Sequence, residues 1–417
     1  MNSALNPASV WLIAFVTIGA ILLRPKKWPE AVWACGGAGL LALTGLIPVA
    51  GALEAVRRGT DVYLFLAGMM LLAELARREG VFEWLASLAV GAAKGSRVRL
   101  FTLVYAVGIV VTALLSNDAT AVVLTPAVYA AVRKARVAPM PYLFACAFIA
   151  NAASFVLPVS NPANLVIYGA GLPSLGAWLR AFLLPSVVAI AVTYATLFWI
   201  SRRELRGAVE AGKDIYRLSA SGRRAVVGLV SGALVMVTAS ALGWNLGAVT
   251  CVVAVPAILL ATGGDGLGSL LSGVSWSVLP LVAGLFVIVE ALYGAGAMKA
   301  AGVALHWLRG MPVIMGSLAA SFGIAALSNL MNNLPSGLLT AGAVQTFGAP
   351  EHLRRALLIG VDLGPNLSVT GSLATILWLV ALRRDGVNIS VWTFLKAGLV
   401  VMVPALVLAV LASHWPA

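Results

Sequence analysis

Long apolar stretches joined by short polar connections make up most of this 417-residue chain. A helix that crosses the hydrocarbon core of a bilayer needs about 20 predominantly apolar residues. Ten stretches suit a membrane span, and we expect one in each: 8–24, 29–50, 61–78, 140–172, 174–200, 225–243, 246–262, 274–294, 352–382 and 388–412. The pattern predicts an all-α protein that crosses a membrane many times.

Two further apolar stretches, 99–132 and 313–347, are too long for one comfortable span and are interrupted halfway by polar residues. The interruptions are 116–118, with the sequence Ser-Asn-Asp, and 328–335, which includes a pair of asparagines and a proline. Irregular backbone at membrane depth persists only where it is buried in protein or lines a wet cavity. We therefore expect each stretch to form a re-entrant hairpin with its polar residues at the tip.

The stretches 140–172 and 352–382 are also interrupted, in this case by helix-breaking residues. The breaks contain Pro158, Pro162, Pro365 and Gly371. A proline removes a backbone donor and clashes with the preceding turn, so each stretch should divide into two half-helices whose free amides and carbonyls need polar partners. We expect two hairpin tips and two broken helices to surround a small polar cavity near the midplane, where transporters bind their substrates.

The two halves of the chain resemble one another. Three pairs of segments align in the same order: 66–74 with 282–290, 117–125 with 332–340, and 151–168 with 362–378. With five spans in each half, the halves would run in opposite directions across the membrane, so we expect an inverted repeat. The predicted units are 1–200, a loop at 201–224, and 225–417.

The composition excludes most other classes of protein. Apolar residues make up 61% of the chain and charged residues 10%, whereas soluble domains carry about 25% charged residues. Cys35, Cys146 and Cys251 each stand alone, and the sequence has no nucleotide-binding or zinc signature. We expect no metal site, no cofactor and no ATPase within this chain.

The net charge of +13 is a topology signal, not a sign of nucleic-acid binding, because the basic residues cluster between apolar stretches. The densest cluster lies in the loop 201–224, which we expect to be cytoplasmic, with both termini outside an inner membrane. Seven basic residues fall on the outer side of this arrangement: Arg57, Arg58, Arg180, Lys299, Arg309, Arg354 and Arg355.

Four acids fall within predicted spans or breaks, where a carboxylate costs about 2.5–3.5 kcal/mol to insert and usually has a function. Asp118 and Asp362 lie in the polar breaks, and Glu74 and Glu290 lie in unbroken spans at equivalent repeat positions. We expect all four to be candidates for proton coupling, although Glu74 is also placed to pair with Arg77 or Arg78. The candidate substrate-binding residues are Asn117, Asp118, Thr120, Asn161, Asn164, Asn332, Asn333, Thr370, Ser372 and Thr375.

The strings at 116–126 (SNDATAVVLTP), 331–335 (MNNLP), 362–365 (DLGP) and 371–375 (GSLAT) closely resemble the ArsB-type arsenite/antimonite efflux permeases of the ion transporter superfamily. The resemblance runs the length of the chain. It implies export of arsenite and antimonite driven by proton entry, in some members together with a soluble ATPase. Its polar break residues correspond to Asn117, Asp118, Asn161, Asn332, Asn333 and Asp362. Asn366 stands where we expect a lysine in that family, and Glu74 and Glu290 have no clear counterparts there.

The mechanism that we expect is alternating access, in which the hairpin-bearing elements move against the other spans. Arsenous acid both donates and accepts hydrogen bonds, so amides and hydroxyls suit it. A sodium/proton antiporter or a small-anion transporter of the same fold is the nearest alternative. An intramembrane aspartyl hydrolase with Asp118 and Asp362 as its dyad is a remote one, and a passive channel would need no titratable pair.

Overall fold

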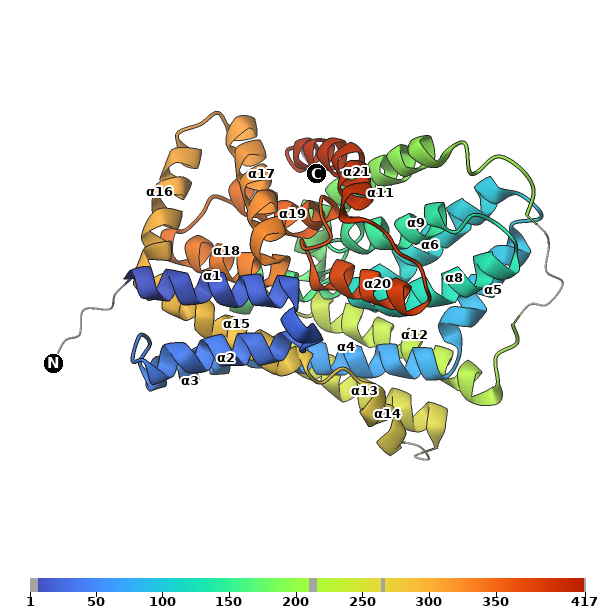
Figure 1. Cartoon of the computed structure of the whole chain (residues 1–417), viewed down its shortest axis with the longest axis horizontal. Coiled ribbons are helices and arrows are strands. Elements are labelled where there is room, and N and C mark those ends of the chain that lie inside the picture. Colours follow the sequence, from blue (N-terminus) through green and yellow to red (C-terminus); the bar gives the residue numbers. More distant parts are fainter. Residues whose placement is uncertain (1–6, 210–215, 264–266, 416–417) are drawn as a thin grey trace.

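The computed structural model describes residues 7–209, 216–263 and 267–415, and all regular elements within these ranges are helices (Figure 1). Residues 210–215 of the predicted basic loop, including Lys213, lie outside the described residues. The all-α polytopic prediction is confirmed by these helices.

The first half contains α1 (Pro7–Leu23), η1 (Pro25–Lys27), α2 (Glu30–Leu43), α3 (Val49–Arg58), α4 (Thr60–Arg78), α5 (Val81–Ala92), α6 (Arg97–Leu114), α7 (Asn117–Ala119), η2 (Thr120–Leu124), α8 (Thr125–Lys134), α9 (Met140–Ala152), η3 (Pro158–Ser160), α10 (Pro162–Tyr168), η4 (Gly169–Gly171) and α11 (Leu175–Ser201). The second half contains α12 (Ala220–Ala241), α13 (Leu246–Thr262), α14 (Leu267–Gly273), α15 (Val278–Leu292), η5 (Tyr293–Ala297), α16 (Met298–Arg309), α17 (Val313–Met331), α18 (Asn333–Phe347), α19 (Glu351–Leu363), η6 (Gly364–Asn366), α20 (Leu373–Arg384) and α21 (Val391–Ala412).

Six helical segments of the described chain are long and apolar enough to cross a membrane: α6, α11, α12, the run of α15 to α16, α17 and α21. The helices α3 and α4 form a further apolar pair, bent by 48°. The shorter apolar helices α1, α2, α9 and α13 coincide with other predicted spans. The sequence pattern missed α5 and α16, because each has 12 residues and an apolar run of that length is too short for a span.

Both predicted breaks divide a helix in the structure. The stretch 140–172 becomes α9 and α10 with the irregular segment 153–161 between them, and 352–382 becomes α19 and α20 with 364–372 between them. The predicted hairpin stretch 99–132 becomes α6 followed by α7, η2 and α8, and the stretch 313–347 becomes α17 followed by α18. The opposite orientation of the two halves stays a prediction.

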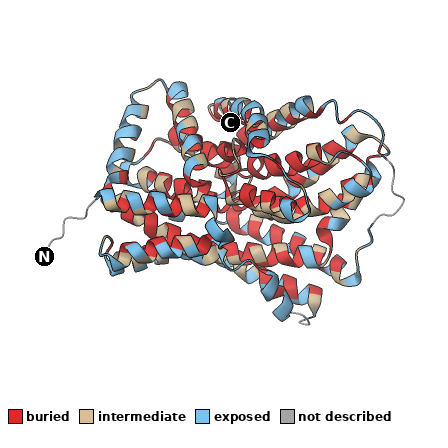
Figure 2. Cartoon of the chain, viewed as in Figure 1, coloured by how far each residue is buried: buried red, intermediate tan, exposed pale blue. Residues whose placement is uncertain are grey.

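The helices pack as two bundles. In the framework bundle, α4 lies against α13, and α2 and α3 lie against α15, while α1 and α12 cover α2 and α13. The hairpin bundle contains α5 to α11 and α16 to α21, with α6 against α9, α17 against α19, and α11 against α21. Figure 1 shows the framework bundle in the lower part of the view. Large apolar residues such as Phe15 and Leu330 are exposed, as expected for surfaces that contact lipid. Figure 2 shows exposed positions in pale blue along the outer helices.

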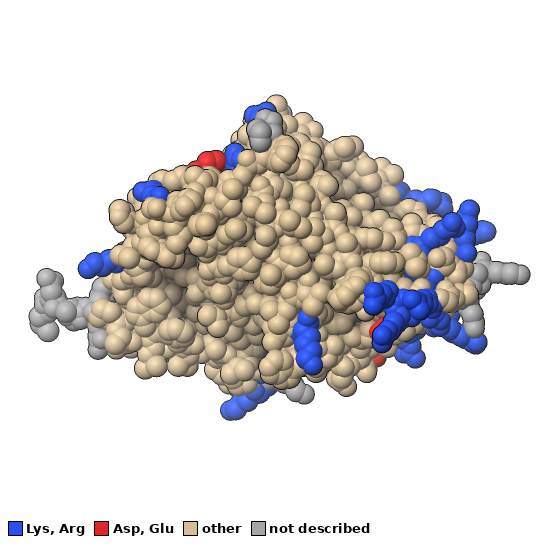
Figure 3. Space-filling model, turned by 90° about the horizontal axis from the view of Figure 1, so that it is seen from above, with Lys and Arg blue, Asp and Glu red and all other residues tan. Residues whose placement is uncertain are grey.

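Basic side chains gather at one end of the molecule, which we call the basic end (Figure 3). It is formed by the C-terminal ends of α4, α8 and α11 with the N-terminus of α6. Arg97 of α6 contacts the loop that follows α11, because its side chain donates to the carbonyls of Glu204 and Ala208 at 3.2 and 3.0 Å. This end matches the face that we expect to be cytoplasmic.

Two glycines at equivalent positions of the halves allow close helix crossings in the framework bundle. A Cβ atom at Gly68 of α4 would lie 2.6 Å from the backbone of Thr250 in α13. A Cβ atom at Gly284 of α15 would lie 2.7 Å from the backbone of Ala34 in α2. Small residues permit such approaches between helices in membranes.

We expect Gly68→Ala or Gly284→Ala to lower the thermal unfolding temperature of the purified protein, because overpacking costs about 1–3 kcal/mol. Gly36→Ala on α2 is the matched control, since a Cβ atom there meets nothing within 4 Å. Equal unfolding temperatures for all three variants would show that the two crossings are not tight.

Candidate functional site

Each hairpin tip is braced by a hydrogen bond between two hydroxyl side chains. In the first half, the hydroxyls of Thr112 and Thr120 lie 2.8 Å apart, and in the second half those of Ser328 and Ser336 lie 2.7 Å apart. All four side chains are buried. Each bond joins two residues that are eight positions apart, one on either arm of the turn.

The residue before each returning helix caps its first amides. Ser116 Oγ accepts from the backbone N of Ala119 at 3.2 Å, and Asn332 Oδ1 accepts from that of Leu334 at 3.3 Å. Asn332 adopts a φ of 80°, a conformation that asparagine tolerates better than most residues. The caps satisfy donors that no water would reach at this depth.

The broken helices are capped in the same way. Asn161 Oδ1 accepts from the N of Ala163 at the start of α10, and Ser372 Oγ accepts from that of Thr375 at the start of α20. Asn164 Nδ2 donates to the carbonyl of Ser154 at 2.8 Å, which braces the irregular segment before α10.

Two buried hydrogen bonds join the two breaks to each other. Asn161 Nδ2 donates to Asp362 Oδ1 at 2.8 Å, and Asn151 Nδ2 donates to Asn366 Oδ1 at 3.0 Å. Asp362 and Asn366 are completely buried. Asp362 Oδ2 and Asn151 Oδ1 have no hydrogen-bond partner among the described residues. The network thus ties the halves together and leaves free acceptor capacity beside the acid.

A cavity of about 50 Å³ lies between the tips and the breaks, and we call it the central cavity. Its polar lining comes from six of the predicted site residues: Asn117, Asp118, Asn161, Asn332, Asn333 and Ser372. All six belong to the hairpin bundle. The framework bundle contributes only aliphatic side chains: Ile21, Leu66, Val278, Leu281, Val282 and Leu285. Among the described residues, the polar lining therefore comes from the hairpin bundle, which also contributes apolar residues such as Leu334 and Ala374.

Four predicted substrate-binding residues lie outside this lining and support it. Thr120 braces the first tip, and Asn164 braces the first break. Thr370 donates to the carbonyl of Asn329 at 2.9 Å, and Thr375 bonds to the hydroxyl of Ser372 at 2.7 Å. Asp362 also lies outside the lining, one hydrogen bond behind Asn161.

The two glutamates form ion pairs away from the central cavity. Glu74 receives two hydrogen bonds from Arg77, at 2.6 and 2.7 Å, so the pairing that the sequence left open is present. Glu290 pairs with Arg58 of α3 at 2.6 Å. No pattern in the sequence predicted the second pair, because its members are far apart along the chain.

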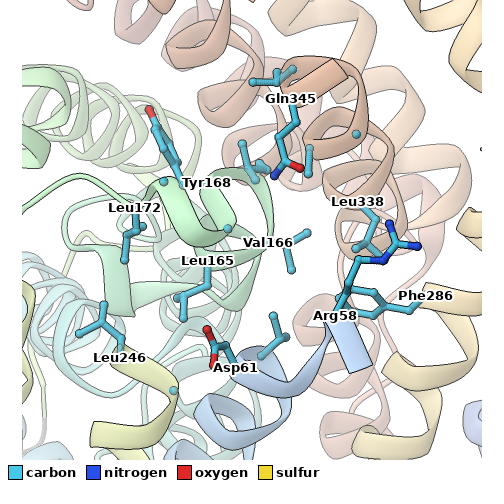
Figure 4. Close-up of a pocket in the computed structure, with 18 of the residues that line it drawn as sticks. Arg58, Asp61, Leu165, Val166, Tyr168, Leu172, Leu246, Phe286, Leu338 and Gln345 are labelled. Carbon is cyan, nitrogen blue, oxygen red and sulfur yellow. The ribbon is translucent and has the colours of Figure 1, made fainter. Parts of the chain in front are cut away.

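A second cavity, of about 740 Å³, lies between the bundles near the start of α4, and we call it the outer cavity (Figure 4). Since α4 ends at Arg77 and Arg78, this cavity lies toward the end opposite the basic end. Its charged lining residues are Arg58, Asp61, Glu290 and Arg354. Figure 4 shows Asp61 and Gln345 pointing into it from opposite sides. Sequence reasoning missed this cavity, although Arg58 and Arg354 stood out as basic residues on the predicted outer side.

Within the described ranges, no group of three or more His, Cys, Asp or Glu side chains is placed to hold a metal ion. The central cavity offers amides, a hydroxyl and a carboxyl group, which can donate and accept hydrogen bonds or exchange a proton.

Comparison with known proteins gives a family and several relatives. Residues 12–361 match the sequence profile of the citrate transporter family, CitMHS. The arsenical pump membrane protein of Escherichia coli K12 is 29% identical over 421 residues, which cover 94% of this chain and 95% of that protein. The arsenical pump membrane protein of Yersinia enterocolitica is 28% identical and covers 81% and 82%. An uncharacterized transporter of Mycobacterium tuberculosis H37Rv is 28% identical and covers 84% of each chain.

Two solved structures share the fold. The YdaH transporter of Alcanivorax borkumensis has a TM-score of 0.57 at 16% identity and covers 88% of each chain. MtrF of Neisseria gonorrhoeae, which belongs to a class of antimetabolite efflux pumps, has a TM-score of 0.50 at 13% identity and covers 90% of this chain and 84% of its own. At these identities the likeness extends to the fold alone.

We expect Asn161→Ser to destabilise the protein. Serine keeps a capping oxygen for α10, but it lacks the amide that donates to Asp362, and an unsatisfied buried acceptor costs about 1–3 kcal/mol. The measurement is the unfolding temperature of Asn161→Ser, Asp362→Leu and the double variant. Asp362→Leu should cost less in the serine background than in the parent, and strictly additive effects would show that the two side chains do not interact.

Proposed function

The chain belongs to the citrate transporter family, and from that premise we propose that it exports arsenite, as arsenous acid, and antimonite in exchange for protons across an inner membrane. Arsenical pump membrane proteins that match nearly the full length of the chain support this cargo. The basic end would face the cytoplasm and the outer cavity the outside.

The size of the central cavity carries the proposal. A water molecule needs about 10–15 Å³ of such volume, so a cavity of about 50 Å³ accepts only a few groups of that size. Arsenous acid, a small centre bearing hydroxyls, has these dimensions. Citrate, a tricarboxylate, is much larger and would require the two walls to move apart.

The charges of the cavity lining also favour arsenous acid over citrate. Asp118 is the acidic side chain of the central cavity, and no Lys, Arg or His is among its described lining residues. A polyanion would therefore meet a carboxyl group and no compensating cation. A neutral hydroxylated solute instead finds amide donors and acceptors at Asn117, Asn161 and Asn333. The same lining could hold a sodium ion, so sodium/proton exchange remains the rival function to test.

Asp118 is the proposed site of proton exchange because its side chain lines the central cavity, where a proton and the solute would compete. Asp362 acts indirectly in this proposal, through its hydrogen bond with Asn161. It holds the amide of Asn161, which lines the cavity, so a change of protonation at Asp362 alters the donors that the solute meets. We assign Glu74 and Glu290 a structural role, since each is already paired with an arginine.

The distribution of polar and aliphatic lining residues between the two bundles supports alternating access. Because the hairpin bundle carries every polar group of the central cavity, its movement along the aliphatic wall of the framework bundle would carry the site without breaking a hydrogen bond between the bundles there. The gradient alone would then drive export, with a soluble ATPase as an optional partner.

We expect everted membrane vesicles that contain this protein to accumulate arsenite when a proton gradient is imposed without ATP, and a protonophore to abolish the accumulation. Parallel vesicles receive sodium or citrate in place of arsenite. Sodium or citrate movement without arsenite accumulation would keep the fold and reject the arsenic assignment.

We expect Asp118→Asn to reduce gradient-driven accumulation to the level of vesicles that lack the protein, because an amide cannot take up and release the coupling proton. Asp362→Asn should also lose accumulation while keeping exchange of labelled for unlabelled arsenite, which needs no net proton transfer. Asp385→Asn, an exposed substitution of the same type, is the control. Uphill accumulation that survives both Asp118→Asn and Asp362→Asn would contradict the coupling assignment.

A further inference from the structure

The two cavities lie one above the other along the same four helices, α4, α10, α15 and α18. On each helix, a residue that lines the outer cavity is about one turn from a residue that lines the central cavity: Val62 and Leu66, Val166 and Pro162, Val289 and Leu285, Leu338 and Leu334. A helical turn rises about 5.4 Å. Only a thin layer of side chains therefore separates the large cavity from the small one.

This layer is apolar and closely packed. Six of its members belong to one cluster of buried side chains, which we call the apolar ring: Val62, Leu66, Val166, Leu285, Val289 and Leu338. Their exposed fractions range from 2% at Val289 to 7% at Leu338. Both sides of the ring are polar, with the charged outer cavity on one side and the asparagine-lined central cavity on the other.

The ring is divided between the two bundles. Val62, Leu66, Leu285 and Val289 stand on the framework helices α4 and α15. Val166 and Leu338 stand on α10 and α18, about one turn beyond the residues that line the central cavity. Figure 4 shows these two side chains in the wall of the outer cavity. Any movement of the binding site relative to the framework must therefore pull the ring apart.

We propose that the apolar ring is the outer gate of this transporter, which keeps water and hydrated ions out of the central cavity in the described conformation. Apolar constrictions close pores by dewetting, without a plug of their own. A hydrated path from the outer cavity to Asp118 would let protons enter without solute exchange, and the ring prevents this leak. The proposal does not depend on which solute the central cavity carries.

The test is the proton leak of proteoliposomes that contain the purified protein and a trapped pH-sensitive dye, with a pH step and no transported solute. Val166→Thr and Leu338→Asn introduce a polar group at nearly constant volume, and we expect each to raise the leak rate by about tenfold as the ring hydrates. Leu338→Met keeps the ring apolar and should leave the leak at the parent rate. Val344→Thr is the matched control for Val166→Thr, because Val344 is a buried valine that lines the outer cavity outside the ring.

A labelling experiment measures the same barrier with the protein folded in the membrane. The three native cysteines are replaced, and Ala374→Cys reports on the central cavity while Gln345→Cys reports on the outer cavity. A charged, membrane-impermeant thiol reagent added from the outer side should label Gln345→Cys quickly and Ala374→Cys slowly, and Leu338→Asn should accelerate only the latter.

Equal labelling of both positions in the parent ring, or a leak that is unchanged by Val166→Thr and Leu338→Asn, would overturn the gate. A leak in Val344→Thr as large as that in Val166→Thr would do the same. Because neither assay contains arsenite, a failure of the arsenic assignment leaves these outcomes unaffected, and a failure of the gate leaves the cargo unaffected.

Discussion

A helix that ends inside a membrane leaves backbone amides and carbonyls with no water to bond, and this constraint governs the centre of the protein. Each of the two hairpin turns and two helix breaks meets it with a polar side chain at the first position: Ser116, Asn161, Asn332 or Ser372. Three of these capping side chains, Asn161, Asn332 and Ser372, also line the central cavity, together with Asn117, Asp118 and Asn333. Half of the polar lining residues described for the cavity are therefore helix caps.

The position of the capped helix ends also explains why the polar groups of the central cavity lie in one bundle. The capped helix starts at the cavity all belong to the hairpin bundle, whereas the described lining residues from α1, α4 and α15 are aliphatic. Aliphatic side chains form no directional bonds with the opposite side of the cavity. Tight backbone crossings at Gly68 and Gly284 hold the framework helices to one another, while the bonds from Asn161 to Asp362 and from Asn151 to Asn366 hold the hairpin bundle together.

Sequence reasoning located the elements that break local rules. A proline or an asparagine within an apolar run has few explanations, so the positions of the breaks and the polar residues of the cavity lining were predictable. Sequence reasoning could not separate side chains that line the cavity from side chains that support it. Thr120 and Asn333 are both polar residues at a break, but Thr120 bonds to Thr112 whereas Asn333 lines the cavity. The pair between Arg58 and Glu290 and the outer cavity depend on how distant helices pack, which local pattern does not encode.

The small volume of the central cavity has a further consequence for resistance to poisons. A cavity of this size would select its solute by excluding larger molecules, because they do not fit. If arsenous acid is the cargo, a bulky aromatic arsenical would bind poorly even though it carries the same arsenic centre. A cell that relies on this protein would then tolerate inorganic arsenic while remaining sensitive to aromatic arsenicals.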